Sequence, residues 1–441
     1  MKNLLIIFII LFQLSSHAQE KWDLQKCIDY AIRHNPKILS QKTRIKIDSL
    51  NLKTQQYDRL PKIDFTAHQA YQLGNTYNVS TGVGQKQSSF TNFNLSAQMT
   101  LFNAWQKKYQ ILYQKNLRDK NQYQYDDAVW QLKSDIINTF FQVLYERENL
   151  SNITYLIDTQ KEQITILEKL YQKQLKPFED ILSAQIDLKK LQLQEQEARK
   201  QNRYYTQKLL DLLHLNQQDI QIDKDIPWHL SVMDTTQIKI ENTPRLLALL
   251  QEISNLETAK KIEISKKYPH VFFNYSFGSN YYHLLGQDDL IYNQQTGNLE
   301  PNGFWTQLKN NRLHYLSVGV SIPIFNGLKT KNKIKELTYK QQIARYDYQS
   351  EKQKLTGLYK QLLNEINQAS KQYNTQKEIF DLTKKSYLLK KEKYINNMIN
   401  YIEWQQIKNN YNKALSKVLQ AKYTLLLKQV SYYKLFESLP K

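Results

Sequence analysis

Residues 93–101 read FNLSAQMTL, in which every second side chain is apolar and those between are Asn, Ser, Gln and Thr. Residues 63–71 (IDFTAHQAY), 271–277 (VFFNYSF) and 316–324 (LSVGVSIPI) alternate in a similar way. A strand of about 9–11 residues with one apolar and one polar face is typical of a membrane-spanning barrel strand. A half-buried strand of a soluble protein alternates in the same way, and Gln69 interrupts the apolar face of residues 63–71. The prediction of membrane-spanning strands therefore rests on the repetition of this pattern in four segments.

The stretches outside these strands are almost free of helix breakers. No glycine lies between Gly84 and Gly278, and after Gly327 at its start, residues 326–396 contain only Gly357. Segments rich in Leu, Lys, Gln and Glu without breakers predict long helices. Residues 103–173 and 326–396 could each form a nearly continuous helix of roughly 100 Å. Apolar residues recur at three and four along them, which indicates packing against a neighbouring helix.

The chain repeats one plan. Leu60-Pro61-Lys62-Ile63 resembles Tyr268-Pro269-His270-Val271, and Leu101-Phe102-Asn103-Ala104 resembles Ile324-Phe325-Asn326-Gly327. We therefore predict two structural repeats, each with a helix, two strands and two long helices. The first covers residues 19–242, with strands about 62–72 and 92–102, long helices about 103–215 and a segment 216–242. The second covers residues 243–441, with strands about 270–281 and 312–325, long helices about 326–434 and a C-terminal tail.

The N-terminus predicts export. Lys2, an apolar run over residues 4–14 and small residues at Ser16 and Ala18 form a signal-peptide pattern over residues 1–18. One cysteine, Cys27, excludes a disulfide framework within the chain. No later segment reaches the roughly 20 consecutive apolar residues of a membrane helix, so an integral protein would have to be a barrel.

Composition argues against several other functions. The formal net charge is +20, but the basic residues are scattered among Gln, Asn and Glu along helical segments, which favours solvated helix faces over a nucleic-acid site. The eight histidines show no metal-ligand spacing, and no nucleophile elbow or phosphate loop occurs. We therefore predict no catalytic, cofactor-binding or metal-binding residue, and no nucleic-acid partner.

Four strands cannot close a membrane barrel, and an open sheet edge cannot face lipid. Two copies would give eight strands and an interior filled by side chains, whereas three would give twelve strands and a lumen. Three or more copies with cyclic symmetry are favoured. The charged helices cannot lie in the bilayer, so they would extend the barrel as a helical tube in the periplasm.

The chain resembles the TolC family of outer-membrane efflux proteins over nearly its whole mature length. The segment from Trp22 to Pro36, with Asn35-Pro36 after its apolar run, is similar to the family's N-terminal helix. Leu60-Pro61 and the stretch from Ile322 to Gly327 also resemble family motifs. Any one of these motifs is weak, but together they occur on the expected repeat plan.

The resemblance implies a mainly α fold with a membrane β portion: a long α-helical barrel and a transmembrane β-barrel, four strands per protomer and twelve in a homotrimer. It implies an outer-membrane channel of a tripartite efflux or type I secretion system, in contact with outer-membrane lipid. A periplasmic adaptor (membrane fusion) protein and an inner-membrane transporter would be its partners. A mixed region is expected at residues 216–242 and the C-terminal tail.

The same resemblance points to the helical hairpin tips as the periplasmic gate. It places Glu403 where a selectivity-ring carboxylate is expected, although Gln406 replaces the following acid. Asp180 holds a comparable place in the first repeat. A threefold ring of carboxylates would attract cations; alternatively, both acids simply stabilise helix N-termini. Tip residues expected to contact an adaptor are Pro177, Phe178, Asn400 and Tyr401.

A soluble periplasmic coiled-coil adaptor or scaffold is the alternative. It explains the long helices equally well but leaves four alternating strands in a duplicated plan unexplained.

Overall fold

The computed structural model describes residues 21–74, 76–77, 84–85, 87–215, 221–223, 240–396 and 398–432. The signal peptide expected at residues 1–18, most of the segment 216–242 and the end of the C-terminal tail lie outside these ranges. The chain divides into two compact units. One comprises Met1–Arg44, Asn121–Ala248 and Tyr348–Lys441; the other comprises Ile45–Lys120 and Leu249–Asp347. Each unit therefore takes segments from both sequence repeats.

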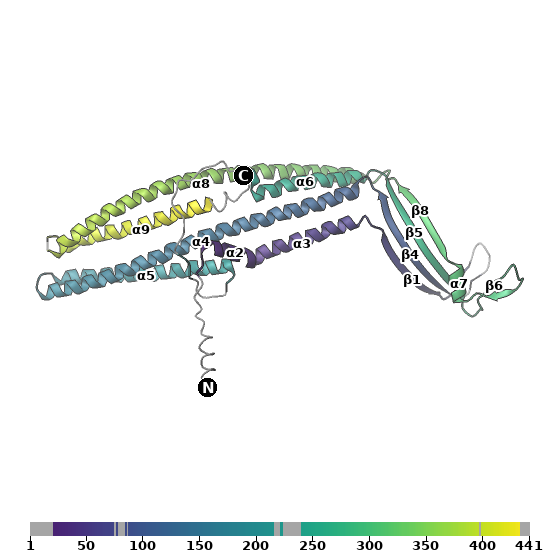
Figure 1. The fold of residues 1–441 in the computed structure, drawn as a ribbon, viewed down its shortest axis with the longest axis horizontal. Helices are drawn as coiled ribbons and strands as arrows, with labels where there is room; N and C mark the ends of the chain where they lie inside the picture. The colour runs from purple at the N-terminus through teal and green to yellow at the C-terminus, as the bar shows by residue number, and fades with distance from the viewer. Residues whose placement is uncertain are drawn as a thin grey trace, which may run out of the picture. The chain divides into compact units, whose positions relative to one another are not determined.

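The helices and strands follow the duplicated plan (Figure 1). The helices are α2 (Leu24–His34), α3 (Pro36–Tyr57), α4 (Gln106–Gln172), α5 (Phe178–Leu213), α6 (Pro244–Ser265), α7 (Phe304–Asn310), α8 (Lys329–Ile395) and α9 (Tyr401–Tyr432), with a short 3-10 turn η1 (Ile240–Asn242). The strands are β1 (Lys62–Gln72), β2 (Thr76–Tyr77), β3 (Gly84–Gln85), β4 (Ser88–Phe102), β5 (His270–Leu284), β6 (Leu290–Tyr292), β7 (Leu299–Pro301) and β8 (Leu313–Ser321).

The long helices match each other between the repeats. Helices α4 and α8 each contain 67 residues. Helix α8 begins 223 residues after α4, and α9 begins 223 residues after α5. The first helix is divided at Asn35-Pro36, because proline at the start of α3 has no N–H to continue the bonds of α2.

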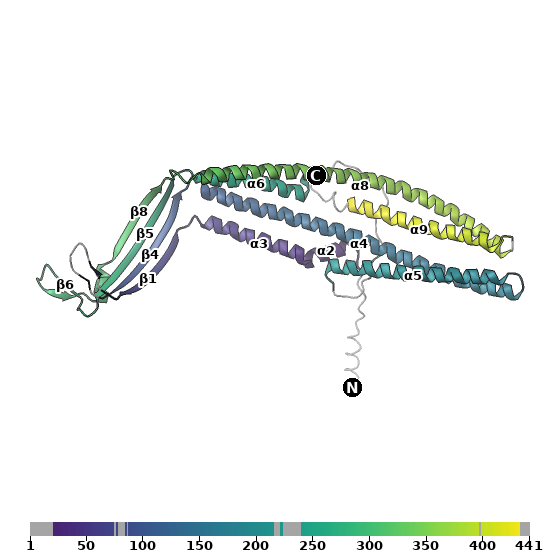
Figure 2. The same cartoon turned by 180° about the vertical axis from the view of Figure 1, so that it is seen from behind.

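The four long strands form one antiparallel sheet in the order β1-β4-β5-β8 (Figures 1 and 2). Phe65, Leu95 and Phe277 lie opposite one another across neighbouring strands, so the apolar residues of the alternating pattern share one face. Among the described residues, the outer edges of β1 and β8 pair with no further strand. Ile63, Phe65 and Leu316 are about two-thirds exposed, so this apolar face is uncovered within the chain.

The strand predictions need two corrections. Strand β8 ends at Ser321 rather than near residue 325, since Pro323 cannot donate to the sheet. The polar face also carries aromatic side chains, among them Phe272, which lies over Gly319: a Cβ atom at that glycine would clash with the Phe272 ring. Gln69, on the apolar face, accepts a hydrogen bond from the Thr91 hydroxyl, which satisfies its amide oxygen.

The longer connection of the second repeat is ordered. Strands β6 and β7 pair as a short hairpin, and α7 follows it. Buried Gln307 accepts from the Tyr282 N–H at 3.0 Å and donates to the Tyr282 and Asn302 carbonyls. The connection between β5 and β8 thus forms a small ordered substructure.

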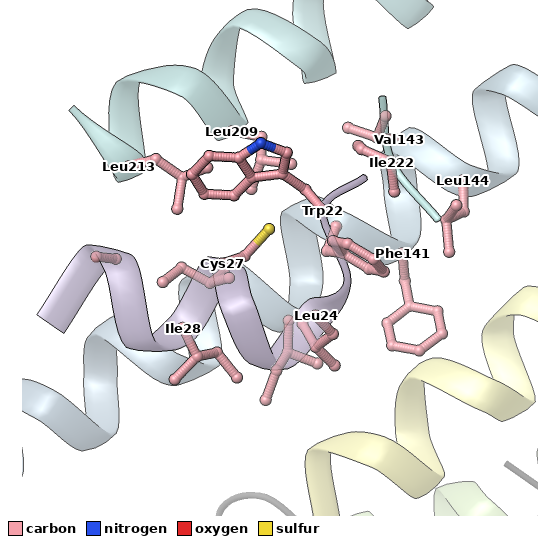
Figure 3. Packing of buried hydrophobic residues seen from close by; sticks show 14 of the residues in the cluster. Trp22, Leu24, Cys27, Ile28, Phe141, Val143, Leu144, Leu209, Leu213 and Ile222 are labelled. Atoms are coloured by element: carbon pink, nitrogen blue, oxygen red, sulfur yellow. The ribbon is translucent and has the colours of Figure 1, made fainter. Parts of the chain in front are cut away.

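An apolar cluster that we call the α2 core lies in the first unit (Figure 3). Side chains of α2, α3, α4, α5 and α9 form it together with Trp22 and Ile222, and Phe140, Phe141, Ile136 and Leu213 are nearly or fully buried. Trp22 and Ile222 also pair as a short parallel bridge, in which the Trp22 N–H donates to the Gln221 carbonyl at 2.7 Å. Cys27 is fully buried here, and burial raises the pKa of its thiol to about 12.

Candidate functional site

The long helices form two hairpins whose turns repeat the same geometry. The Leu175 N–H donates to the Leu170 carbonyl, and 223 residues later the Met398 N–H donates to the Lys393 carbonyl, both at 2.9 Å. Both bonds close the end of a helix with the six-to-one pattern common at helix C-termini. In Figures 1 and 2, α5 lies along α4 and α9 lies along α8. We call the contact between these two hairpins near their turns the seam.

The seam is closed nearest the turns by Tyr394 and Asp180. The Tyr394 hydroxyl on α8 lies 3.4 Å from Asp180 Oδ2 on α5, a long hydrogen bond. The Lys176 ammonium lies 4.2 Å from the centre of the Tyr394 ring, within the range of a cation–π contact. Burial raises the pKa of the Asp180 carboxyl, while Lys176 and the tyrosine hydroxyl act against that rise. Burial beside this carboxylate also raises the pKa of Tyr394.

One heptad further from the turns, a second carboxylate accepts bonds from α9. Asp187 on α5 accepts from the Tyr401 hydroxyl at 3.4 Å and from the Gln405 amide at 2.5 Å. Lys190 lies 3.5 Å from the other carboxylate oxygen. Asp180 and Asp187 are seven residues apart on α5, and their partners Tyr394 and Tyr401 lie on either side of the second turn, on α8 and α9.

The third polar contact buries a charge. Lys408 of α9 is 7% exposed and donates to the side-chain carbonyls of Gln160 and, at 3.2 Å, Gln163 on α4. Gln160 is fully buried and donates its own amide to the Ala184 carbonyl of α5 at 2.7 Å. Burial lowers the pKa of Lys408 to about 8, because a desolvated ammonium is disfavoured.

Apolar and aromatic side chains surround these polar contacts. Ile164, Leu167, Ile181 and Ala184 from the first hairpin pack with Tyr394, Tyr401 and Trp404 from the second. The Trp404 ring stacks on Tyr394 with centroids 5.6 Å apart and packs against Tyr387 at 5.1 Å. Within the described residues, Trp404 Nε1 and Gln163 Nε2 are buried without a hydrogen-bond partner. Such groups cost about 1–3 kcal/mol each, so the seam is less well satisfied than an apolar core.

The residues predicted for this region divide into two sets. Asp180 and Tyr401 lie in the seam, where Tyr401 is only 6% exposed and is directed at Asp187. Pro177, Phe178 and Asn400 are exposed at the turns. Glu403 is exposed in the first turn of α9, where its N–H donates to the Asn400 side chain at 2.9 Å.

Sequence reasoning missed Asp187, Gln160 and Lys408. For two of them the signal was a seven-residue spacing along one helix: Lys408 follows Tyr401 by seven residues on α9, and Asp187 follows Asp180 by seven on α5, whereas Gln160 on α4 belongs to neither series. Polar residues at positions that face a partner helix are candidates for specific contacts between helices.

Among the described residues, no helix is long and apolar enough to cross a membrane. Within the same ranges, no group of three or more His, Cys, Asp or Glu side chains is arranged to hold a metal ion.

Comparison with protein families identifies one match, described as outer membrane efflux protein, over residues 27–213 and 237–436. No curated protein sequence matches the chain.

Solved structures with the same fold are outer-membrane proteins. The outer membrane protein VceC from Vibrio cholerae is 11% identical, with a TM-score of 0.74 over 93% of this chain and 95% of that one. The CmeC outer membrane channel of Campylobacter jejuni is 17% identical, with a TM-score of 0.75 over 94% and 85% of the two chains. The MtrE outer membrane channel of Neisseria gonorrhoeae, solved in an open state, is 16% identical, with a TM-score of 0.73 over 95% and 91%.

The family match covers most of the chain, including both hairpins, and the structural matches extend over the sheet and helices together. This favours a channel over the soluble adaptor or scaffold alternative, and places the chain among transport proteins. The chain belongs to the outer membrane efflux protein family and is an outer-membrane efflux channel with a TolC-like fold.

Proposed function

We propose that three copies of this chain assemble into a passive duct, whose sheets close a twelve-stranded barrel in the outer membrane. One observation carries this proposal: the four-stranded sheet has two edges and an apolar face that no other described residues of the chain pair or cover. Lipid would cover that face, and neighbouring copies would pair the edges. Three copies leave a lumen, whereas two would fill it with side chains.

The helical hairpins would continue the duct into the periplasm, with the seam as its gate. A gate requires contacts that hold one arrangement and can be exchanged for another. The long tyrosine–aspartate bonds and the unsatisfied Trp404 and Gln163 groups fit that requirement better than an apolar interface would. In this proposal, movement of the second hairpin away from the first opens the periplasmic end.

The exposed turns would receive the partners. Pro177, Phe178 and Asn400 present an apolar and an amide surface at the ends of the hairpins, and we assign them to an adaptor of an inner-membrane transporter. Glu403 is exposed one turn further on and is our candidate for a selectivity ring. Tyr401 contributes from inside the seam and not as a surface contact.

The test is the molar mass of detergent-extracted protein by light scattering, corrected for bound detergent, followed by conductance in planar bilayers. A mass of three chains and discrete ion-conducting openings are expected. A monomer or dimer released from membranes by salt alone would overturn the duct.

A further inference from the structure

The tyrosine–aspartate contacts alone do not fix the register between the hairpins. Helices α5 and α9 run parallel, and Tyr401 lies opposite Asp187. Moving the second hairpin seven residues away from the turns would bring Tyr394 to the level of Asp187 and Tyr401 to that of Gln194. Both tyrosines would still face an acceptor, so these contacts tolerate that shift.

A shift of the same size toward the turns is opposed by the end of the first hairpin. It would bring Tyr394 to the level of residue 173, before α5 begins at Phe178. The carboxylate contact of Tyr394 would then have no replacement on that helix. Only the shift away from the turns needs a further restraint.

Lys408 supplies that restraint, because its acceptors do not repeat. Seven residues before Gln160 and Gln163, α4 carries Ile153 and Leu156, the two side chains that the lysine would meet after the shift. The buried ammonium would then lose both amide carbonyls, and an unpaired buried charge costs several kcal/mol. In the observed register the Lys408 ammonium donates to Gln160 and Gln163, and the Gln160 amide donates in turn to the Ala184 carbonyl.

We propose that Lys408 is a positioning residue that fixes the axial register of the second hairpin on the first. A single buried Asn or Lys in a helical interface can specify register at a cost in stability. This inference deepens the proposed gate, on which its functional meaning rests: the correct register sets Tyr394 against Asp180 and Tyr401 against Asp187.

The axial register of the second hairpin on the first can be measured independently of ion conduction. Spin labels on Lys189→Cys in α5 and Lys413→Cys in α9, both at exposed positions, report the distance between the hairpins in a Cys27→Ala background. Full-length labelled chains are diluted with unlabelled chains, so that distances between copies do not contribute. A one-heptad shift displaces the labels along the helix axis by about 10 Å.

The unmodified seam and Lys408→Arg, which keeps the charge and the donors, should give a single distance. Lys408→Met should add a second, discrete distance population, which a general loss of stability would not produce. Ile153→Gln should do the same with Lys408 intact, because it offers an acceptor in the shifted register, whereas Ile153→Leu should not.

A single unshifted distance in Lys408→Met would overturn the proposal. If that variant fails to assemble, a single unshifted distance in Ile153→Gln would overturn it instead. These readings stand even if the protein fails to conduct, so failure of the gate and failure of the register assignment are distinguishable.

Discussion

The α2 core and the seam share helices α4, α5 and α9 but differ in their chemistry. In the α2 core, α4 and α5 contribute Phe140, Phe141 and Leu213 to a cluster of apolar side chains. In the seam, the same two helices contribute Asp180, Asp187 and Gln160 among aromatic rings.

The comparison shows how one long hairpin can be held firmly at one level and can exchange its contacts at another. Apolar burial grows with the area removed from water, so the α2 core holds its helices together strongly. Hydrogen bonds depend on distance and angle, and each contributes only about 1 kcal/mol net. The seam is therefore specific and comparatively easy to open.

The largest expected effect lies in the α2 core. Phe141→Ala removes a buried ring and should lower the free energy of unfolding by about 3–5 kcal/mol. Tyr155→Ala, on the same helix but 65% exposed, should cost well under half as much. Thermal unfolding in detergent, followed by circular dichroism, compares the two variants. Equal losses would mean that the α2 core does not hold the helices together.

The second prediction concerns the buried charge of the seam. The pKa of Lys408 is depressed to about 8 in the fold, against an ordinary 10.5, so folding favours the neutral amine. The stability that this group contributes is fully present above about pH 10.5, the pKa of the lysine in the unfolded chain. It decreases as the pH falls from there and is lost once the pH passes below about 8, the pKa in the fold. Between those limits the free energy of unfolding should rise with pH by roughly 3 kcal/mol.

Lys408→Met should remove this rise. Asp187, the titratable group on α5 whose charge acts on the lysine, is present in both proteins, so its own titration contributes to both profiles. Denaturant unfolding at pH 7, 9 and 11 makes the measurement. Parallel pH profiles for the two proteins would show that the lysine is not desolvated.

The third prediction weakens the seam nearest the turns. Tyr394→Phe deletes the hydroxyl that donates to Asp180 but keeps the ring against Trp404 and Lys176. A loss of about 1 kcal/mol should increase the open probability in planar bilayers about fivefold. Tyr171→Phe, an exposed ring on α4 that contacts Phe178, is the matched control and should leave it unchanged. An open probability that is unchanged in both variants would show that the contact between Tyr394 and Asp180 does not contribute to gating.

The smallest effect is expected at Glu403. Glu403→Gln should change stability by less than about 1 kcal/mol, since the side chain is an exposed acid in the first turn of α9. If the carboxylate belongs to a ring in the pore, the reversal potential in a salt gradient should shift toward weaker cation preference. An unshifted reversal potential would leave Glu403 as an acid that stabilises its helix.

Much of the fold could be predicted from local pattern. Alternation located the four long strands, and the scarcity of glycine and proline located α4 and α8 to within a few residues. The end of β8 was misplaced because alternation continues past Ser321 through Ile322 and Ile324, whereas the missing N–H of Pro323 interrupts the sheet. Phe272 was equally unforeseen, because its place on the polar face depends on the space above Gly319 in the neighbouring strand.

The candidate site was harder to predict because its contacts join residues more than 200 positions apart. Asp180 was selected as an acid near a turn, but its partner Tyr394 is visible only when α5 and α8 are placed side by side. Tyr401 was expected at the surface from its position beside the turn, yet it is buried against the first hairpin.

Local sequence pattern was sufficient to predict the duplicated plan, the lengths of the long helices and the two faces of the sheet. These properties arise from periodicity and backbone preference, which act over a few residues. The pairing of polar side chains across the hairpins, the burial of Lys408 and the bonds of Gln160 to two other helices follow only from the folded chain. Such contacts depend on the rotation and register of one helix against another, and these arise from side chains that are far apart in the sequence.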